Sequence, residues 1–174
     1  ALSGYHFPAR IGVAWIEPQP DRWLSAVAAA ARRAGVAVLI GAPERDAEKN
    51  TLHNSAFLFD ADGEMAGRWR KITVASDGWS RPGTDLSPIR WHAPRHGDFA
   101  LGVLICADAF TPHVVARLAA EGAELLLSPA NWGPGLHGPN GEWEARSRET
   151  GLPFIVCNRT GVDDTLDFTE AESL

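Results

Sequence analysis

Cys106 is the residue best suited to carry out chemistry, and it is one of only two cysteines in the chain. It lies in the run Gly102-Val-Leu-Ile-Cys106-Ala-Asp108, and Thr111-Pro112 follows as a helix cap with proline at the first helical position. Open α/β sheets place reactive groups at this end of a buried strand, where a helix N-terminus favours a thiolate. Backbone N–H groups in such a turn can also bind an oxyanion. The other interpretation of Cys106 is a buried, inert thiol, which is the one we adopt for Cys157.

Lys71 is the second candidate, because only two of the 16 basic residues are lysines. If residues 64–74 form a strand, the alternation of side chains puts Lys71 on the same face as Met65 and Trp69. A lysine on an apolar face needs a partner or a function. A lysine at the end of a strand can instead extend its ammonium group into solvent. The strand pattern leaves both interpretations open.

Several other chemistries are disfavoured by the sequence. The six histidines have no metal-ligand spacing, and the chain has no Cys-x-x-Cys, His-Glu-x-x-His, P-loop or Gly-x-Ser-x-Gly motif. With 16 basic and 22 acidic residues the net charge is −6, which argues against nucleic acid and anionic membranes as partners. No apolar run approaches the roughly 20 residues of a membrane span. Two cysteines imply no disulfide framework, and we expect a cytoplasmic protein.

The elements that must position Cys106 and Lys71 alternate between short apolar runs and helical stretches, which predicts one α/β domain over residues 1–174. A helix is expected between Asp21 and Gly35, and a strand at 36–41 that Pro43 closes. Further strands are expected at 54–59, 64–74, 99–105, 124–128 and 153–158, and further helices at 112–122 and 142–150. The glycine- and proline-rich stretches 77–88 and 131–141 are predicted loops. Trp132, together with Asn131, is expected to line a pocket.

In chain order, the motifs resemble those of the nitrilase superfamily of carbon–nitrogen hydrolases, and the resemblance covers essentially the whole sequence. The residues that carry it are Asn54-Ser-Ala56, Gly63, Arg70-Lys71, Arg81-Pro-Gly83, Ile105-Cys-Ala-Asp108, Pro112, Arg117, Gly122-Ala-Glu-Leu-Leu-Leu-Ser-Pro129, Trp132, Arg146-Ser-Arg-Glu149, Asn158-Arg159 and Gly161.

This resemblance implies a four-layer αββα sandwich, here truncated at both ends, and a Glu–Lys–Cys catalytic set. Cys106 matches the nucleophile and Lys71 the lysine, while the backbone N–H of Ala107 would join Lys71 in stabilising the oxyanion. The family needs no metal or organic cofactor. Its helix corresponding to Pro112–Glu121 packs across a dimer interface, so a homo-oligomer is expected.

The chain departs from the family pattern in ways that bear on function. The family glutamate base would lie just before Ala1, upstream of the segment 2–5, so we expect the 174-residue piece to be inactive alone. Between the lysine and the Pro-Gly pair the family often has a second glutamate, whereas this chain has only Asp77 as a possible auxiliary acid. Cys106-Ala-Asp108 favours a small amide or carbamoyl substrate over a nitrile. The alternatives are a binding pseudoenzyme and an acyl-transfer or glutaminase module of a larger enzyme.

Overall fold

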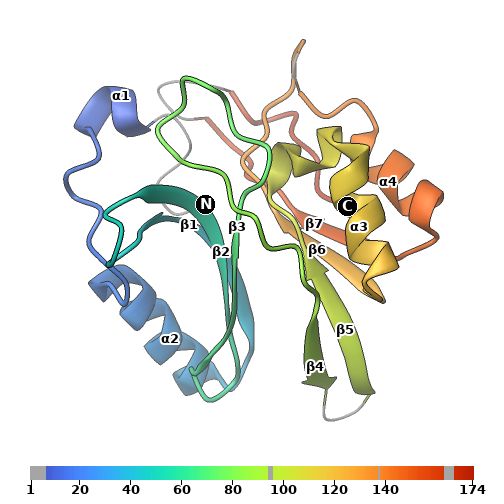
Figure 1. Cartoon of the computed structure of the whole chain (residues 1–174), viewed down its shortest axis with the longest axis horizontal. Helices are drawn as coiled ribbons and strands as arrows, with labels where there is room; N and C mark the ends of the chain where they lie inside the picture. Colours follow the sequence, from blue (N-terminus) through green and yellow to red (C-terminus); the bar gives the residue numbers. More distant parts are fainter. Residues whose placement is uncertain (1–6, 94–95, 137, 163–166) are drawn as a thin grey trace. The chain divides into compact units, whose positions relative to one another are not determined.

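The computed structural model describes residues 7–93, 96–136, 138–162 and 167–174 (Figure 1). The chain divides into two compact units, Ala1–Thr84 and Asp85–Leu174, and each unit has its own sheet. The segment 2–5, before which the family glutamate is expected, lies outside the described residues. The assignment of residues 1–174 to one domain therefore stays a prediction.

The first unit is an antiparallel three-stranded sheet in the order β1-β2-β3, with helix α2 along it (Figure 1). Its elements are α1 (Phe7–Ile11), α2 (Arg22–Ala34), β1 (Val38–Arg45), β2 (Leu52–Phe59) and β3 (Met65–Arg70).

Helix α2 confirms the helix that the sequence predicts between Asp21 and Gly35. The Asp21 carboxylate accepts a hydrogen bond of 2.7 Å from the N–H of Leu24, and Gly35 ends the helix with φ +63°. Leu24 is buried against Phe57 and other apolar side chains of the sheet. This packing supplies the core of the first unit.

Strand β1 is longer than the sequence predicts, because Pro43 does not close it. The strand continues to Arg45, and Pro43 lies opposite Asn54 of β2. Since β1 is at the edge of its sheet, a proline that cannot donate a hydrogen bond is tolerated there. The extension brings Glu44 into the strand.

The second unit contains a four-stranded sheet in the order β4-β5-β6-β7 (Figure 1). Strands β5, β6 and β7 are parallel, so their carboxyl ends meet at one edge. The elements are β4 (Ile89–Ala93), β5 (Gly97–Val103), the 3₁₀ helix η1 (Cys106–Phe110), α3 (Pro112–Ala120), β6 (Leu125–Pro129), α4 (Glu142–Thr150) and β7 (Phe154–Cys157). The predicted helices at 112–122 and 142–150 are confirmed, whereas β4 was not predicted.

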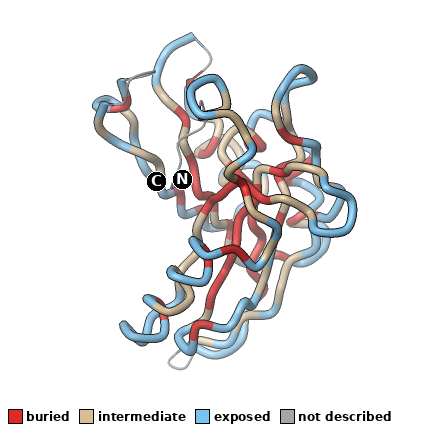
Figure 2. Tube along the Cα trace, turned by 90° about the vertical axis from the view of Figure 1, so that its left-hand side faces the viewer, coloured by how far each residue is buried: buried red, intermediate tan, exposed pale blue. Residues whose placement is uncertain are grey.

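Figure 2 colours the chain by burial, and the buried residues come from the strands of both sheets and from helices such as α2 and α3. Residues 100–105 are all buried, as expected of a strand covered on both faces. Gly102 has a specific role there, because a Cβ at this position would lie 3.0 Å from side-chain atoms of both Ala123 and Leu126. The glycine lets Ala123, which follows α3, and Leu126 of β6 pack closely on β5.

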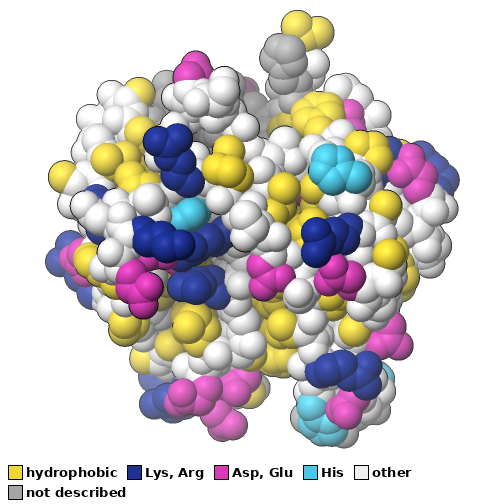
Figure 3. All heavy atoms as spheres, in the orientation of Figure 1, with side chains coloured by type: hydrophobic (Ala, Val, Ile, Leu, Met, Phe, Trp, Pro, Cys, Tyr) yellow, Lys and Arg dark blue, Asp and Glu magenta, His cyan; other side chains and the backbone are white. Residues whose placement is uncertain are grey.

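None of the helices in the described residues is long and apolar enough to cross a bilayer. On the face shown in Figure 3, acidic and basic side chains lie beside one another.

Candidate active site

Cys106 is the first residue of η1, shortly after the end of β5, and its backbone has an unusual conformation. Its φ is +54°, in the left-handed region that residues other than glycine rarely occupy. The Cys106 N–H donates a 3.0 Å hydrogen bond to Oγ of Ser128, which lies in the neighbouring strand β6. Cys106 is partly buried. The cysteine is therefore presented on a tight turn at the carboxyl edge of the parallel strands.

Asp108 holds this turn in place. Its Oδ2 accepts a 3.0 Å hydrogen bond from the N–H of Ile105, and its own N–H donates to the carbonyl of Ile105 at the same distance. The side chain is only 1% exposed. Backbone strain of the kind seen at Cys106 persists only where surrounding interactions impose it, and these bonds do so. Asp108 belongs to the Cys106-Ala-Asp108 motif, but this role was not predicted from the sequence, although its position two residues after the cysteine could have suggested it.

Trp132 lies beside the turn that carries Cys106. Its ring is 4.7 Å from that of Phe110, the last residue of η1, and 5.3 Å from that of Trp143 in α4. Asn158 fixes its backbone at two points, accepting from the Trp132 N–H at 3.0 Å and donating to its carbonyl at 2.9 Å. This clamp could not be predicted from the sequence, because nothing local links residues 132 and 158.

Asn131, the other predicted pocket residue, follows β6 at the same edge of the sheet. Neither its side-chain oxygen nor its nitrogen is exposed, and neither has a hydrogen-bond partner in the described part of the chain. A buried amide left unpaired costs about 1–3 kcal/mol per group. The structure thus places Asn131 after β6, at the edge of the sheet that also carries Cys106, without showing what its amide binds.

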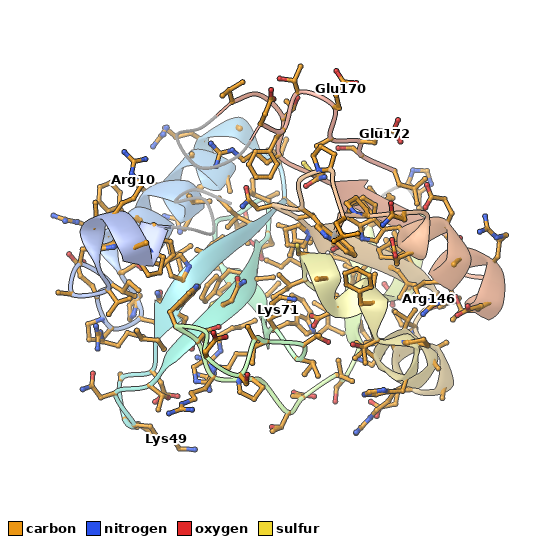
Figure 4. The ribbon with its side chains drawn as sticks, turned by 90° about the horizontal axis from the view of Figure 1, so that it is seen from above. Arg10, Lys49, Lys71, Arg146, Glu170 and Glu172 are labelled. Carbon is orange, nitrogen blue, oxygen red and sulfur yellow. The ribbon has the colours of Figure 1, made fainter. Side chains whose placement is uncertain are left out.

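A pocket of about 120 Å³ lies elsewhere in the second unit, beside α4. Trp143 and three carboxylates line it: Glu144 from α4, and Glu170 and Glu172 from the C-terminal segment (Figure 4). Cys106 is not among the residues that line this pocket, and the pocket was not predicted from the sequence. Among the described residues, no group of three or more His, Cys, Asp or Glu side chains is placed to hold a metal ion.

Lys71 belongs to the first unit and follows the last residue of β3 (Figure 4). It is 4% exposed, and its neighbour Trp69 is 5% exposed, so both side chains are buried as their shared face predicts. Met65 is 58% exposed, because a bulge between Leu58 and Phe59 shifts the register and reverses the alternation. Of the two interpretations of Lys71, the one in which its ammonium group extends into solvent is therefore wrong.

The backbone of Lys71 is held on both sides. Its N–H donates to the Asn54 carbonyl at 2.7 Å, and its carbonyl accepts from the Gly83 N–H at 2.8 Å. Gly83 approaches so closely that a Cβ there would lie 2.5 Å from the Arg70 carbonyl oxygen. The Pro-Gly pair of the motif thus packs against the lysine-bearing end of β3.

Arg70 connects the lysine position to a buried carboxylate. Glu44, which is 0% exposed, accepts hydrogen bonds from Arg70 at 2.5 Å, from Arg68 at 3.1 Å and from the Ser55 hydroxyl at 2.5 Å. Asp46 also accepts from Arg70, at 2.8 Å. Burial raises the pKa of Glu44, but the hydrogen bonds from Arg70 and Ser55 and the charges of both arginines outweigh it, so the pKa is lowered.

Asp77, the possible auxiliary acid, lies in an exposed turn after β3. The structure thus brings Cys106, Ala107, Asn131 and Trp132 into the second unit, and Lys71 and Asp77 into the first. Within the first unit, Lys71 is buried and Asp77 is exposed. An auxiliary role for Asp77 stays a prediction.

His53 predicts a pH dependence for the stability of the first unit. It is 6% exposed, with Nδ1 2.9 Å from the Arg81 carbonyl and Nε2 3.1 Å from Thr51 Oγ1. Burial and the charge of Arg70 lower its pKa below the ordinary value of 6.5, although the bond to Arg81 opposes this. The unfolded chain binds the His53 proton more readily than the folded chain does. The contribution of neutral His53 to the free energy of unfolding is therefore complete above about pH 6.5, and it is lost as pH falls toward the pKa of His53 in the folded protein.

We therefore expect the free energy of unfolding to fall between pH 7.5 and 5.5, and to fall less in a His53→Asn variant. Urea denaturation of the full-length protein at both pH values measures this. His113→Asn, at an exposed position of α3, is the matched control and should behave as the wild type. Equal pH dependence in wild type and His53→Asn would contradict the assignment.

Comparison with known proteins places the chain in a family. A model of carbon–nitrogen hydrolases matches residues 1–171. The chain belongs to the carbon–nitrogen hydrolase family, in the nitrilase superfamily. This confirms the resemblance drawn from the motifs.

Three relatives of this carbon–nitrogen hydrolase chain have informative names. Nitrilase 3, from an unknown prokaryotic organism, is 50% identical over 128 residues, covering 71% of this chain and 36% of the relative. An (R)-stereoselective amidase from Pseudomonas sp. is 29% identical over 172 residues, covering 94% of this chain and 57% of the relative. The amidase of Nesterenkonia sp. AN1 superposes with a TM-score of 0.80 at 25% identity, covering 94% of this chain and 64% of its own.

These relatives confirm the mixed α/β fold and link the chain to amidases that have an active-site cysteine. The chain spans about half the length of the first curated relatives it matches, 48% and 44% of their sequences. The activity of the complete protein is therefore a matter for proposal.

Proposed function

We propose that the complete protein hydrolyses a small amide or carbamoyl substrate through a thioester on Cys106. The observation that carries this proposal is the strained turn at Cys106, which the bonds of Asp108 to Ile105 maintain at the carboxyl edge of a parallel sheet. In a variant of the related Nesterenkonia amidase, acrylamide is added at the active-site cysteine, and another variant of it binds butyramide. We further propose that the whole chain adopts the four-layer αββα sandwich of the family.

The proposed reaction divides amide hydrolysis into two steps. A glutamate base, as the family resemblance implies, takes the proton of the Cys106 thiol, and the sulfur attacks the amide carbon. The ammonium group of Lys71 and the N–H of Ala107 stabilise the oxyanion, the C–N bond breaks, and the amine leaves with the proton. Water, activated by the same glutamate, then cleaves the thioester and restores the thiol. Amide and water give carboxylic acid and amine.

The roles of the remaining residues follow from this scheme. Trp132 is proposed to form a wall of the acyl pocket, because its ring packs on Phe110 next to the nucleophile turn. Asn131 is proposed to line the same pocket. Lys71 fits the role of an oxyanion donor, because it is buried and its backbone is held on both sides.

The test is ammonia release from butyramide and from butyronitrile by the full-length protein, with mass analysis of the acid-quenched enzyme. We expect butyramide to react at least about tenfold faster, and a butyryl group on the peptide that contains Cys106. Lys71→Met should lower kcat about 10²–10³-fold, as loss of one oxyanion donor does. Lys49→Met, at an exposed position, is its control, and Cys157→Ala controls for the second thiol.

Faster turnover of butyronitrile would instead indicate a nitrilase, in keeping with the name of one relative. No butyryl group on Cys106, together with full activity in Lys71→Met, would overturn the proposed mechanism.

A further inference from the structure

The buried carboxylate of Glu44 has no task in the proposed reaction, yet it is bound to the residue next to Lys71. Glu44 lies in β1, Ser55 in β2 and Arg70 in β3, so their side chains form a continuous polar link across all three strands of the sheet. Arg70 Nε adds two further contacts to the Glu44 carboxylate, at 3.1 and 3.2 Å. The side chain of Arg70 is 22% exposed.

This link acts at the place where β3 would otherwise be least constrained. β3 is an edge strand, and Arg70 is its last residue. Strand ends fray, and the backbone of Lys71 continues directly from this end. Anchoring the Arg70 side chain to β1 therefore fixes the direction in which the next Cα–Cβ bond, that of Lys71, leaves the backbone.

The energetics point the same way. A buried ion pair is a weak source of stability, because removing the charges from water offsets most of their attraction. Apolar side chains in the same positions could stabilise the sheet as well. What the ion pair of Glu44 and Arg70 adds is a fixed position for the end of β3. This matters for catalysis, because an oxyanion donor loses much of its effect when it is displaced by about an ångström.

We propose that Glu44 is a positioning residue for Lys71, acting through Arg70. This inference rests on the proposed function, since it gives Glu44 a task in the same reaction. Glu44 touches neither the substrate nor the reacting atoms; its effect passes through the end of β3.

The experiment is a double-mutant cycle on kcat with Glu44→Gln and Lys71→Met, in the full-length protein with butyramide. Glu44→Gln should lower kcat about tenfold, with KM changed less than about twofold, because the substrate is bound but its oxyanion is poorly stabilised. In the Lys71→Met background the same substitution should have almost no further effect. Folded fractions are matched by circular dichroism at the assay temperature.

Arg68→Met is the matched control. Arg68 also binds Glu44, at 3.1 Å, but it lies two residues before the end of β3 and is 46% exposed. Its kcat should stay within about twofold of wild type. Arg70→Met, by contrast, should reproduce the loss of kcat seen in Glu44→Gln.

The outcomes separate the two proposals. If Lys71→Met leaves kcat unchanged, the proposed function fails at its oxyanion step. If Lys71→Met lowers kcat but Glu44→Gln does not, or if the two effects multiply in the double variant, Glu44 has only a structural role and the inference is overturned.

Discussion

Cys106→Ala and Cys106→Gly are expected to be equally inactive but unequally stable. Loss of the nucleophile should lower kcat for butyramide by about 10⁴-fold or more, as in other enzymes with a covalent intermediate. Both variants lack the sulfur, so neither can form the thioester.

The difference in stability comes from the backbone of Cys106. At φ +54° any residue with a Cβ is strained by about 1–2 kcal/mol, whereas glycine is not. Alanine keeps the strain and glycine relieves it, at some cost in the entropy of the unfolded chain. We therefore expect Cys106→Gly to be about 1 kcal/mol more stable than Cys106→Ala.

Urea denaturation of the full-length variants, alongside the ammonia assay, tests both parts. Ala107→Gly is the control for stability, because the φ of Ala107 is not positive and glycine there should destabilise by about 0.5–1 kcal/mol. Turnover by Cys106→Ala would show that another residue is the nucleophile. A Cys106→Gly variant less stable than Cys106→Ala would show that the turn does not impose the left-handed conformation.

Arg70→Met is expected to lower the free energy of unfolding by about 3 kcal/mol. The substitution removes the closest ionic partner of Glu44, whose carboxylate is fully buried and cannot be solvated in its place. The substitution leaves Glu44 with only the half-exposed Arg68 as an ionic partner, and the poor compensation of a buried carboxylate accounts for the size of the effect.

Arg68→Met should cost less than about 1 kcal/mol, because Arg68 is half exposed and Arg70 continues to neutralise Glu44. Adding Glu44→Gln to Arg70→Met should recover part of the lost stability, since a neutral amide is less costly to bury than an unpaired carboxylate. Urea denaturation at pH 7.5 measures all three variants. Equal losses for Arg68→Met and Arg70→Met, with no recovery in the double variant, would contradict this account.

Much of the fold follows from local patterns. Helix α2 could be predicted because Asp21 and Gly35 are cap residues whose chemistry acts over a few positions. The strand before Cys106 is equally local, since an apolar run of this length is typical of a strand buried on both faces. The extent of β1 beyond Pro43 was not predictable, because the tolerance for proline depends on β1 being an edge strand.

The candidate site also has features that local sequence predicts and features that depend on strand pairing. Cys106 and Lys71 stand out by residue type and motif, and the family resemblance they carry is confirmed. The exposure of Met65 depends instead on an irregularity in the pairing of β2 with β3. This bulge reverses the alternation of side chains that the sequence alone implies.

The sequence by itself indicated the candidates and the family: a cysteine at the end of a buried apolar run, a lysine two residues after Trp69, and an acidic chain of carbon–nitrogen hydrolase type. Only the tertiary structure decided how they are held. The bond of Cys106 to Ser128 in β6, the clamp of Asn158 on Trp132 and the link from Glu44 to Arg70 all join residues distant in the chain. Local propensity extends over a few residues, whereas strand pairing and burial bring these partners together, so no sequence window contains them.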